Sequence, residues 1–82
     1  MFTIKSISED GEYYLVNHWN KHKAFWQQKD QCTANTTFKS IRTANASLTK
    51  LLKVMPEYAA DTFTPVRVEW DQNHYCYNVT DI

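Results

Sequence analysis

The chain has 82 residues, enough for one small domain and too few for two. Apolar residues make up 43% of it and aromatic residues 15%, which provides material for a core, and the single glycine and two prolines argue against a disordered chain. The formal net charge is zero, and no segment looks like a signal peptide or approaches the roughly 20 apolar residues of a membrane span. We therefore expect a cytoplasmic protein with no membrane partner.

Two strands are expected at the start of the chain, over residues 2–7 and 13–17. Both segments are rich in β-branched or aromatic residues, and the first alternates in polarity. Between them lie Glu9, Asp10 and the only glycine, Gly11, at a place where a positive φ is useful. The pattern predicts an antiparallel hairpin.

Residues 18–29 (HWNKHKAFWQQK) mix aromatic and basic side chains. Trp19 and Trp26 are seven residues apart, so a short extra helix near residues 20–29 would place both on one stripe that closes the core. The alternative is that they are exposed and stack on bases. His18 and His22 would share a face of such a helix and could bind zinc, but further ligands are lacking nearby. We expect no metal and no cofactor.

The clearest helix begins after Ser40, whose hydroxyl can accept a hydrogen bond from the first turn. Its apolar positions recur at three- and four-residue spacing: Ile41, Ala44, Leu48, Leu51, Leu52 and Met55. Arg42 and Lys53 fall on the opposite side. Pro56 should end the helix near Val54, because the residue before a proline avoids the helical region.

The last part of the chain predicts a second hairpin around a two-residue loop, Gln72 and Asn73. This register pairs Trp70 with Tyr75, Val68 with Tyr77 and Val66 with Val79. These residues share one face because side chains alternate along a strand, and the other face is polar. The sequence thus predicts an α+β fold in a single domain of residues 1–82. A four-stranded antiparallel sheet of two hairpins carries one main helix on one face, in the order ββαββ.

Charge is distributed unevenly along the chain. Residues 21–53 hold seven basic residues and one acid, for a net +6, and the remaining residues carry −6. The two parts either neutralise each other in the fold or mark a surface for a partner, and the sequence leaves both readings open.

Basic residues interleaved with aromatic ones suit single-stranded RNA or DNA, because lysines neutralise phosphates while rings stack on bases. The candidate residues for this surface are Lys21, Lys23, Trp26, Lys39, Arg42 and Lys53. The scarcity of arginine and the isoelectric point near 6.8 argue against a strong nucleic-acid binder.

Catalytic motifs do not stand out in the sequence. Cys32 and Cys76 are expected to be free thiols. Cys76 and His74 would share a strand face and could form a nucleophilic pair, but no element for stabilising an oxyanion accompanies them. We expect no catalytic residues and a protein that is not an enzyme.

The N-terminal hairpin, the AFW connection, the F-K-S start of an Ala/Leu/Lys helix (FKSIRTANASLTKLL) and the strand VRVEW together resemble small uncharacterised accessory proteins of tailed phages. This chain departs from that pattern in its long polar connection (QQKDQCTANTT) and its extended C-terminal hairpin. The resemblance implies a small α+β scaffold in the host cytoplasm that binds a host macromolecule, for instance as a counter-defence factor or inhibitor.

Partner classes follow from size and from this resemblance. A host protein is the preferred partner, and RNA or single-stranded DNA is the second. A homodimer is also expected to be favourable, because a domain of this size has only about 5 kcal/mol of stability and gains buried area on pairing.

Overall fold

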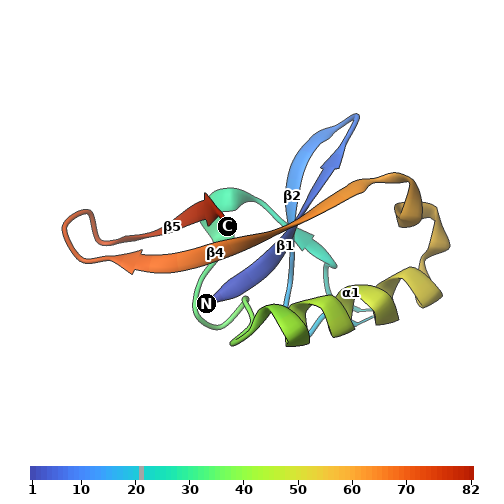
Figure 1. Cartoon of the computed structure of the whole chain (residues 1–82), viewed down its shortest axis with the longest axis horizontal. Coiled ribbons are helices and arrows are strands. Elements are labelled where there is room, and N and C mark those ends of the chain that lie inside the picture. Colours follow the sequence, from blue (N-terminus) through green and yellow to red (C-terminus); the bar gives the residue numbers. More distant parts are fainter. Residues whose placement is uncertain (21) are drawn as a thin grey trace.

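A computed structural model describes residues 1–20 and 22–82 of the chain. These residues form a five-stranded antiparallel sheet, in the order β3-β2-β1-β4-β5, and one α-helix (Figure 1). The strands are β1 (Phe2–Ser8), β2 (Gly11–Leu15), β3 (Trp26–Gln27), β4 (Thr62–Asp71) and β5 (Cys76–Asp81), the helix is α1 (Ile41–Val54), and 3-10 helices are η1 (Lys29–Gln31) and η2 (Pro56–Ala60). The molecule measures 40 × 24 × 24 Å, and the β4–β5 hairpin projects along its long axis (Figure 1). The α+β class is confirmed, whereas the prediction of four strands in the order ββαββ is wrong in detail.

The N-terminal hairpin forms as predicted. Strands β1 and β2 pair antiparallel, and Ser8 lies opposite Gly11, so the turn consists of Glu9 and Asp10. Gly11 has a φ of 127°, in a region that side chains with a Cβ avoid. The second strand runs over Gly11–Leu15, two residues earlier at each end than predicted.

The predicted short helix near residues 20–29 is wrong. The described part of this span holds a tight turn, in which the Lys23 N–H donates to the Asn20 carbonyl, and the short strand β3. Strand β3 pairs with β2 through Tyr14 and Leu15 and provides the fifth strand. A strand is favoured over a helix here because the edge of β2 has backbone N–H and C=O groups that can pair with this segment. Next to β3, for example, the Val16 N–H donates a hydrogen bond to the Phe25 carbonyl.

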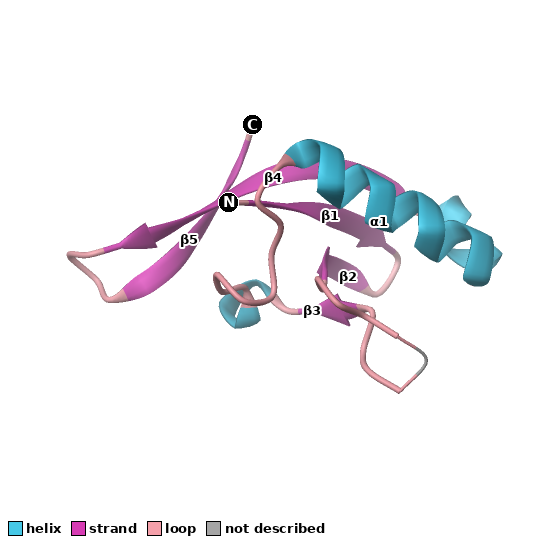
Figure 2. Cartoon of the chain, turned by 90° about the horizontal axis from the view of Figure 1, so that it is seen from below, coloured by secondary structure: helices cyan, strands magenta, loops and turns pink. Residues whose placement is uncertain are grey.

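Helix α1 begins and ends where the sequence predicts. The Ser40 hydroxyl accepts a hydrogen bond from the Thr43 N–H, and the helix ends at Val54, two residues before Pro56. Its apolar stripe faces the sheet and buries Ala44, Leu48 and Leu51 completely or nearly so. Figure 2 shows α1 running beside β1 and β4.

The C-terminal hairpin has the predicted faces but a different register. Asp71 pairs with Cys76, so the loop has four residues, and Trp70 lies opposite Tyr77 instead of Tyr75. Val68 likewise pairs with Val79, and Val66 pairs with Asp81. The Asp71 carboxylate accepts hydrogen bonds from the N–H groups of Asn73 and His74, a local turn that takes two further residues into the loop. A shift of two residues keeps every side chain on its face of the sheet, which is why the faces were predicted correctly.

The two faces of the sheet carry separate apolar clusters. Thr3 and Ile4 are neighbours on β1 and therefore point to opposite faces. On the Ile4 side, α1 covers Leu15 and Phe38, and several part-buried aromatic residues complete this cluster. On the Thr3 side, the cluster is smaller and consists of Tyr14, Cys32, Val66 and Val68, with Tyr77 and Val79 at its margin.

Within the described residues, no helix combines the length and the apolar character needed to cross a bilayer.

Candidate functional site

The structure places Trp26 in the core, apart from the exposed basic residues that the sequence grouped with it. Lys39, Arg42 and Lys53 are exposed on or beside α1, on the side away from the sheet, and Lys23 is exposed in the connection between β2 and β3. Lys21 lies outside the described residues. Trp26 is part-buried and packs against the helix-side cluster.

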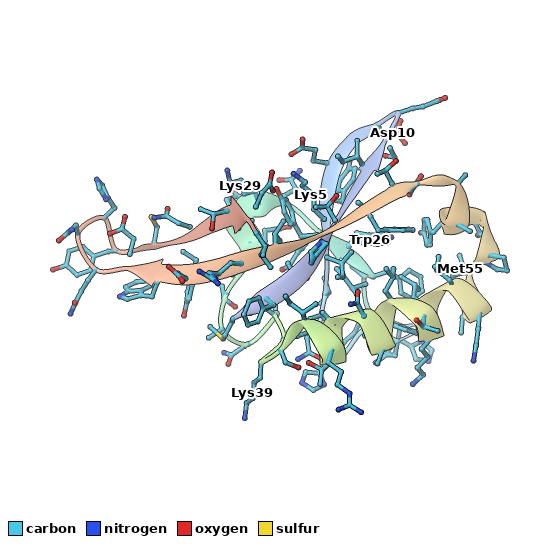
Figure 3. All side chains as sticks on the ribbon, viewed as in Figure 1. Lys5, Asp10, Trp26, Lys29, Lys39 and Met55 are labelled. Atoms are coloured by element: carbon cyan, nitrogen blue, oxygen red, sulfur yellow. The ribbon has the colours of Figure 1, made fainter. Side chains whose placement is uncertain are left out.

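Trp26 belongs to an aromatic group inside the fold. Its ring stacks on Phe63, with centroids 6.1 Å apart, and meets Tyr58 edge-on at 5.6 Å. It also lines a hollow of about 190 Å³ together with Asp10 and Asp61. Figure 3 shows Trp26 in the interior and Lys39 at the start of α1. Since its neighbours here are aromatic and acidic, Trp26 is separated from the lysines that would hold phosphate.

Trp19 is also part-buried, but it lies beside α1. Its indole N–H donates to the Ser47 hydroxyl at 2.8 Å, and its ring meets Phe25 edge-on at 5.4 Å. The Lys50 ammonium lies 5.6 Å from the centre of the Trp19 ring, within the range of a cation–π contact. Trp19 therefore joins the helix to the β2–β3 connection and leaves a basic side chain beside it.

A hollow of about 690 Å³ opens next to this tryptophan. It is lined by polar, aromatic and basic residues from the β2–β3 connection and from α1: Asn17, His18, Trp19, Phe38, Lys39, Thr43, Ala46, Ser47 and Lys50. His18 has a φ of 62°, which is uncommon for a residue with a side chain and is found preferentially at turns and functional sites. We call this hollow, together with Lys39, Arg42, Lys50 and Lys53, the helix surface.

Ion pairs among the described residues do not involve the basic middle segment. They join Lys5 to Asp81 at 3.0 Å, Arg67 to Glu69 at 3.7 Å and His74 to Asp71 at 2.7 Å. All six of these residues come from the acidic remainder of the chain. In the described residues, the positive charge of residues 22–53 is therefore not neutralised by direct ion pairs across the fold.

A second hollow, of about 790 Å³, lies on the opposite face of the sheet, between η1 and the projecting hairpin. It is lined by residues of the η1 segment and of the hairpin: Gln28, Lys29, Asp30, Cys32, Thr33, Trp70, Tyr75, Cys76 and Tyr77. The rings of Trp70 and Tyr77 meet edge-on at 5.0 Å. Trp70 is 51% exposed and Tyr75 is 80% exposed. We call Trp70, Tyr75, Tyr77 and this hollow the hairpin surface.

The two cysteines lie in different environments. Cys32 is buried, and burial raises the pKa of its thiol to about 11. A raised pKa favours the neutral thiol, which is the opposite of what a nucleophile needs. Cys76 is exposed. His74, two residues before it, directs its ring Nδ1 to the Asp71 carboxylate, 2.7 Å away. The geometry does not assemble the cysteine–histidine pair that the sequence suggested.

His18 and His22 do not share a helix face, because the helix that would align them is absent. Among the residues that the structure describes, no three His, Cys, Asp or Glu side chains gather in a way that could hold a metal ion.

Sequence reasoning missed several residues of both surfaces. Lys50 and Ser47 were assigned to the helix, but only the fold brings Trp19 to them. Trp70 and Tyr77 were placed correctly on the apolar face of the hairpin, and this amphipathic pattern is the signal that could have identified the hairpin surface. The exposure of Trp70 was not predictable, because it depends on how far the segments that cover this face of the sheet extend along the hairpin.

Comparisons with known proteins give no further identification. No protein-family model matches the chain, and neither a curated protein nor a solved structure shows a significant similarity to it. The resemblance to accessory proteins of tailed phages therefore stays a prediction.

Proposed function

We propose that this protein is a non-catalytic binding protein that acts by contacting another protein through its hairpin surface. The observation that carries the proposal is the exposure of Trp70 and Tyr75 on a hairpin that projects from the fold (Figure 1). Large aromatic side chains lose favourable burial when they face water. Trp and Tyr are also the residues that contribute most often to binding energy at protein interfaces.

The hollow beside these rings gives the surface a shape suited to recognition. Its volume of about 790 Å³ falls within the range of roughly 300–1,000 Å³ typical of ligand pockets. Trp70 and Tyr77 form one wall and Cys32 contributes from the η1 side. A large apolar side chain of the partner fits this combination of aromatic wall and apolar floor.

Strand β5 adds a second means of contact. It is the outermost strand of the sheet, and its six residues contain neither proline nor lysine, two residues that commonly protect sheet edges from pairing. Its outer backbone N–H and C=O groups can pair with an extended segment of the partner, which then becomes a sixth strand. The opposite edge, β3, has only two residues and offers much less.

The resemblance in sequence directs the proposal to a bacterial host protein as the partner. An accessory or counter-defence factor of a phage acts in this way by covering or redirecting a host protein. The exposed aromatic wall and the free edge of β5 give such a factor its contact.

Affinity capture tests this function. The tagged protein is incubated with nuclease-treated bacterial lysate, and retained proteins are quantified by mass spectrometry for the wild type and for Trp70→Ala combined with Tyr75→Ala. We expect the wild type to retain a defined host protein and the double variant to lose at least tenfold of it, because both anchors are removed.

Val54→Ala is the matched control, because Val54 is similarly exposed, at 57%, but lies on α1. Its capture should equal that of the wild type. Retention of the same proteins by the double variant, or of no specific protein by the wild type, would refute the proposal. Sedimentation of the purified protein alone tests whether a second copy of the chain binds the hairpin surface, as the predicted homodimer would require.

A further inference from the structure

The helix surface carries four positive side chains on one side of α1. At 100° per residue, Arg42, Lys50 and Lys53 lie within about 80° of one another around α1, opposite the buried Leu48. Lys39 precedes the helix by two residues, at the same end as Arg42. All four side chains are exposed, and the sequence of α1 contains no acidic residue.

Interaction with the helix dipole accounts for two of these four positive charges. Lys50 and Lys53 lie toward the carboxyl end of α1, where a positive charge interacts favourably with the helix dipole. Lys39 and Arg42 lie at the amino end, where a positive charge is unfavourable and acidic residues are usual. The first turn of α1 has no acid. The helix dipole therefore does not account for the cations at this end.

The hollow of the helix surface lies beside these cations and has polar groups of its own. The side chains of Lys39 and Lys50 line it together with Trp19. The Thr43 and Ser47 hydroxyls, which also line it, can make further hydrogen bonds besides those to Ser40 and Trp19. Its volume, about 690 Å³, is large enough for a flat polar ring system.

We propose that the helix surface is a binding site for single-stranded nucleic acid. The backbone phosphates contact Lys39, Arg42, Lys50 and Lys53, and one unstacked base enters the hollow beside Trp19. Arg42 and Lys53 are 11 positions apart, or about 16 Å along the helix, and this spread of charge suits a chain of phosphates better than a single small anion. A single strand is favoured over a duplex because only an unpaired base can leave the stack and enter a hollow.

This site differs from the surface that the sequence predicted. It retains Lys39, Arg42 and Lys53, replaces Trp26 by Trp19 and adds Lys50. Lys23 is not part of it, and Lys21 lies outside the described residues. It is also separate from the hairpin surface, on the other side of the sheet. Figure 3 shows Lys39 on the α1 side of β4 and Lys29, which lines the hairpin hollow, on the other side.

Fluorescence anisotropy with a labelled, mixed-sequence single-stranded oligonucleotide tests the site. About four phosphate contacts predict a slope near −3 for the logarithm of affinity against the logarithm of salt, or a roughly 50-fold loss between about 50 and 200 mM. Arg42→Glu combined with Lys50→Glu should weaken binding at least tenfold at low salt. Both residues are exposed, and circular dichroism with urea unfolding checks that the variant remains folded.

Matched controls locate the site. Lys50→Glu and Lys29→Glu make the same change of charge on opposite sides of the sheet, and only Lys50→Glu should weaken binding. Trp70→Ala combined with Tyr75→Ala should leave binding unchanged, which separates this site from the proposed function. Equal weakening by Lys29→Glu would overturn the location.

Two further measurements test the class of ligand. The same sequence as a duplex should bind several-fold more weakly than the single strand, and anionic phospholipid vesicles should not retain the protein. No anisotropy change at low salt, a duplex that binds as tightly as the single strand, or vesicles that compete with the oligonucleotide would each overturn the proposal.

Discussion

Each side of the sheet carries a tryptophan, but one packs in the core and the other is exposed. On the helix side, α1 and η2 cover Trp26, which stacks on Phe63, and the basic residues remain outside. On the hairpin side, Cys32 from the end of η1 packs in the cluster with Val68, whereas Trp70 stays 51% exposed across the hollow from η1. Both tryptophans therefore lie on one continuous sheet, and only the extent of the covering layer makes one part of the core and the other part of the surface.

This difference shows how a small domain can present an aromatic surface without losing its core. The helix-side cluster is the larger and includes α1, so it provides most of the apolar burial. The projecting end of the hairpin is held by backbone pairing of β4 with β5 and by its turn. Its aromatic face is consequently free for a partner.

Replacing each tryptophan tests this comparison directly and should give the largest effect. Trp26→Ala should lower the free energy of unfolding by about 3 kcal/mol, because it removes a packed ring from the core. Trp70→Ala should cost only about 1 kcal/mol, the size of its edge-on contact with Tyr77. Urea unfolding followed by circular dichroism measures both.

Trp26→Phe provides a measurable variant if Trp26→Ala does not fold, and its cost should lie between those of the other two. Equal costs for Trp26→Ala and Trp70→Ala would show that the two sides of the sheet do not differ as described.

The reactivity of the two cysteines tests which part of the hairpin side is covered, because Cys32 is buried there and Cys76 is exposed. At pH 8, a thiol with a pKa of about 11 has roughly one part in a thousand as thiolate, and Cys32 is also only 1% exposed. Iodoacetamide should therefore modify Cys76 at least 100-fold faster than Cys32 in the folded protein. Mass spectrometry of the peptides gives both rates, and in denaturant the two should become similar. Fast modification of Cys32 in the native protein would contradict its place in the covered cluster.

A smaller effect concerns the start of the covering helix. Ser40→Ala removes the hydrogen bond from the Thr43 N–H and should lower the free energy of unfolding by about 1 kcal/mol. Lys39→Ala, one residue earlier and exposed, should change it by less than about 0.5 kcal/mol. Denaturant midpoints of the two variants check the difference. Because α1 covers only one side, hydrogen exchange in the hairpin should change less than exchange in α1.

The smallest effect is a pH dependence at the tip of the hairpin. Hydrogen bonds from His74 and Asn78, and from the N–H groups of Asn73 and His74, lower the pKa of Asp71 below its usual value near 3.8. The ionised Asp71 carboxylate therefore stabilises the turn at any pH above its pKa in the unfolded chain. This stabilisation is lost as the pH falls through the lower pKa that Asp71 has in the folded protein. The side-chain carboxyl chemical shift of Asp71 should therefore titrate below the usual value near 3.8, while the amide shifts of α1 remain constant over the same acid range.

Asp71→Asn keeps an acceptor for the turn but removes the titration, so its amide shifts should not depend on pH in this range. A titration midpoint of the Asp71 carboxyl at or above 3.8 in the wild type would contradict the hydrogen-bonded turn.

Much of the fold was predictable where a signal is local. Ser40 and Pro56 bound α1 within a few residues of each end, because capping and the restriction before proline act on adjacent backbone groups. The turn at Glu9 and Asp10 was predictable for the same reason. The candidate sites were predictable only in part: three lysine or arginine positions of the helix surface were identified, but not the tryptophan that completes it.

The sequence by itself determined the α+β class, the bounds of α1, and which residues share a face of each hairpin, because periodicity and capping are properties of neighbouring residues. Only the tertiary structure decided that residues 26–27 form a fifth strand and that the loop after Asp71 has four residues. It also decided that Trp19 and Trp26 belong to the fold while Trp70 faces solvent. These outcomes depend on backbone partners and covering layers supplied by segments distant in sequence, and no local pattern contains that information.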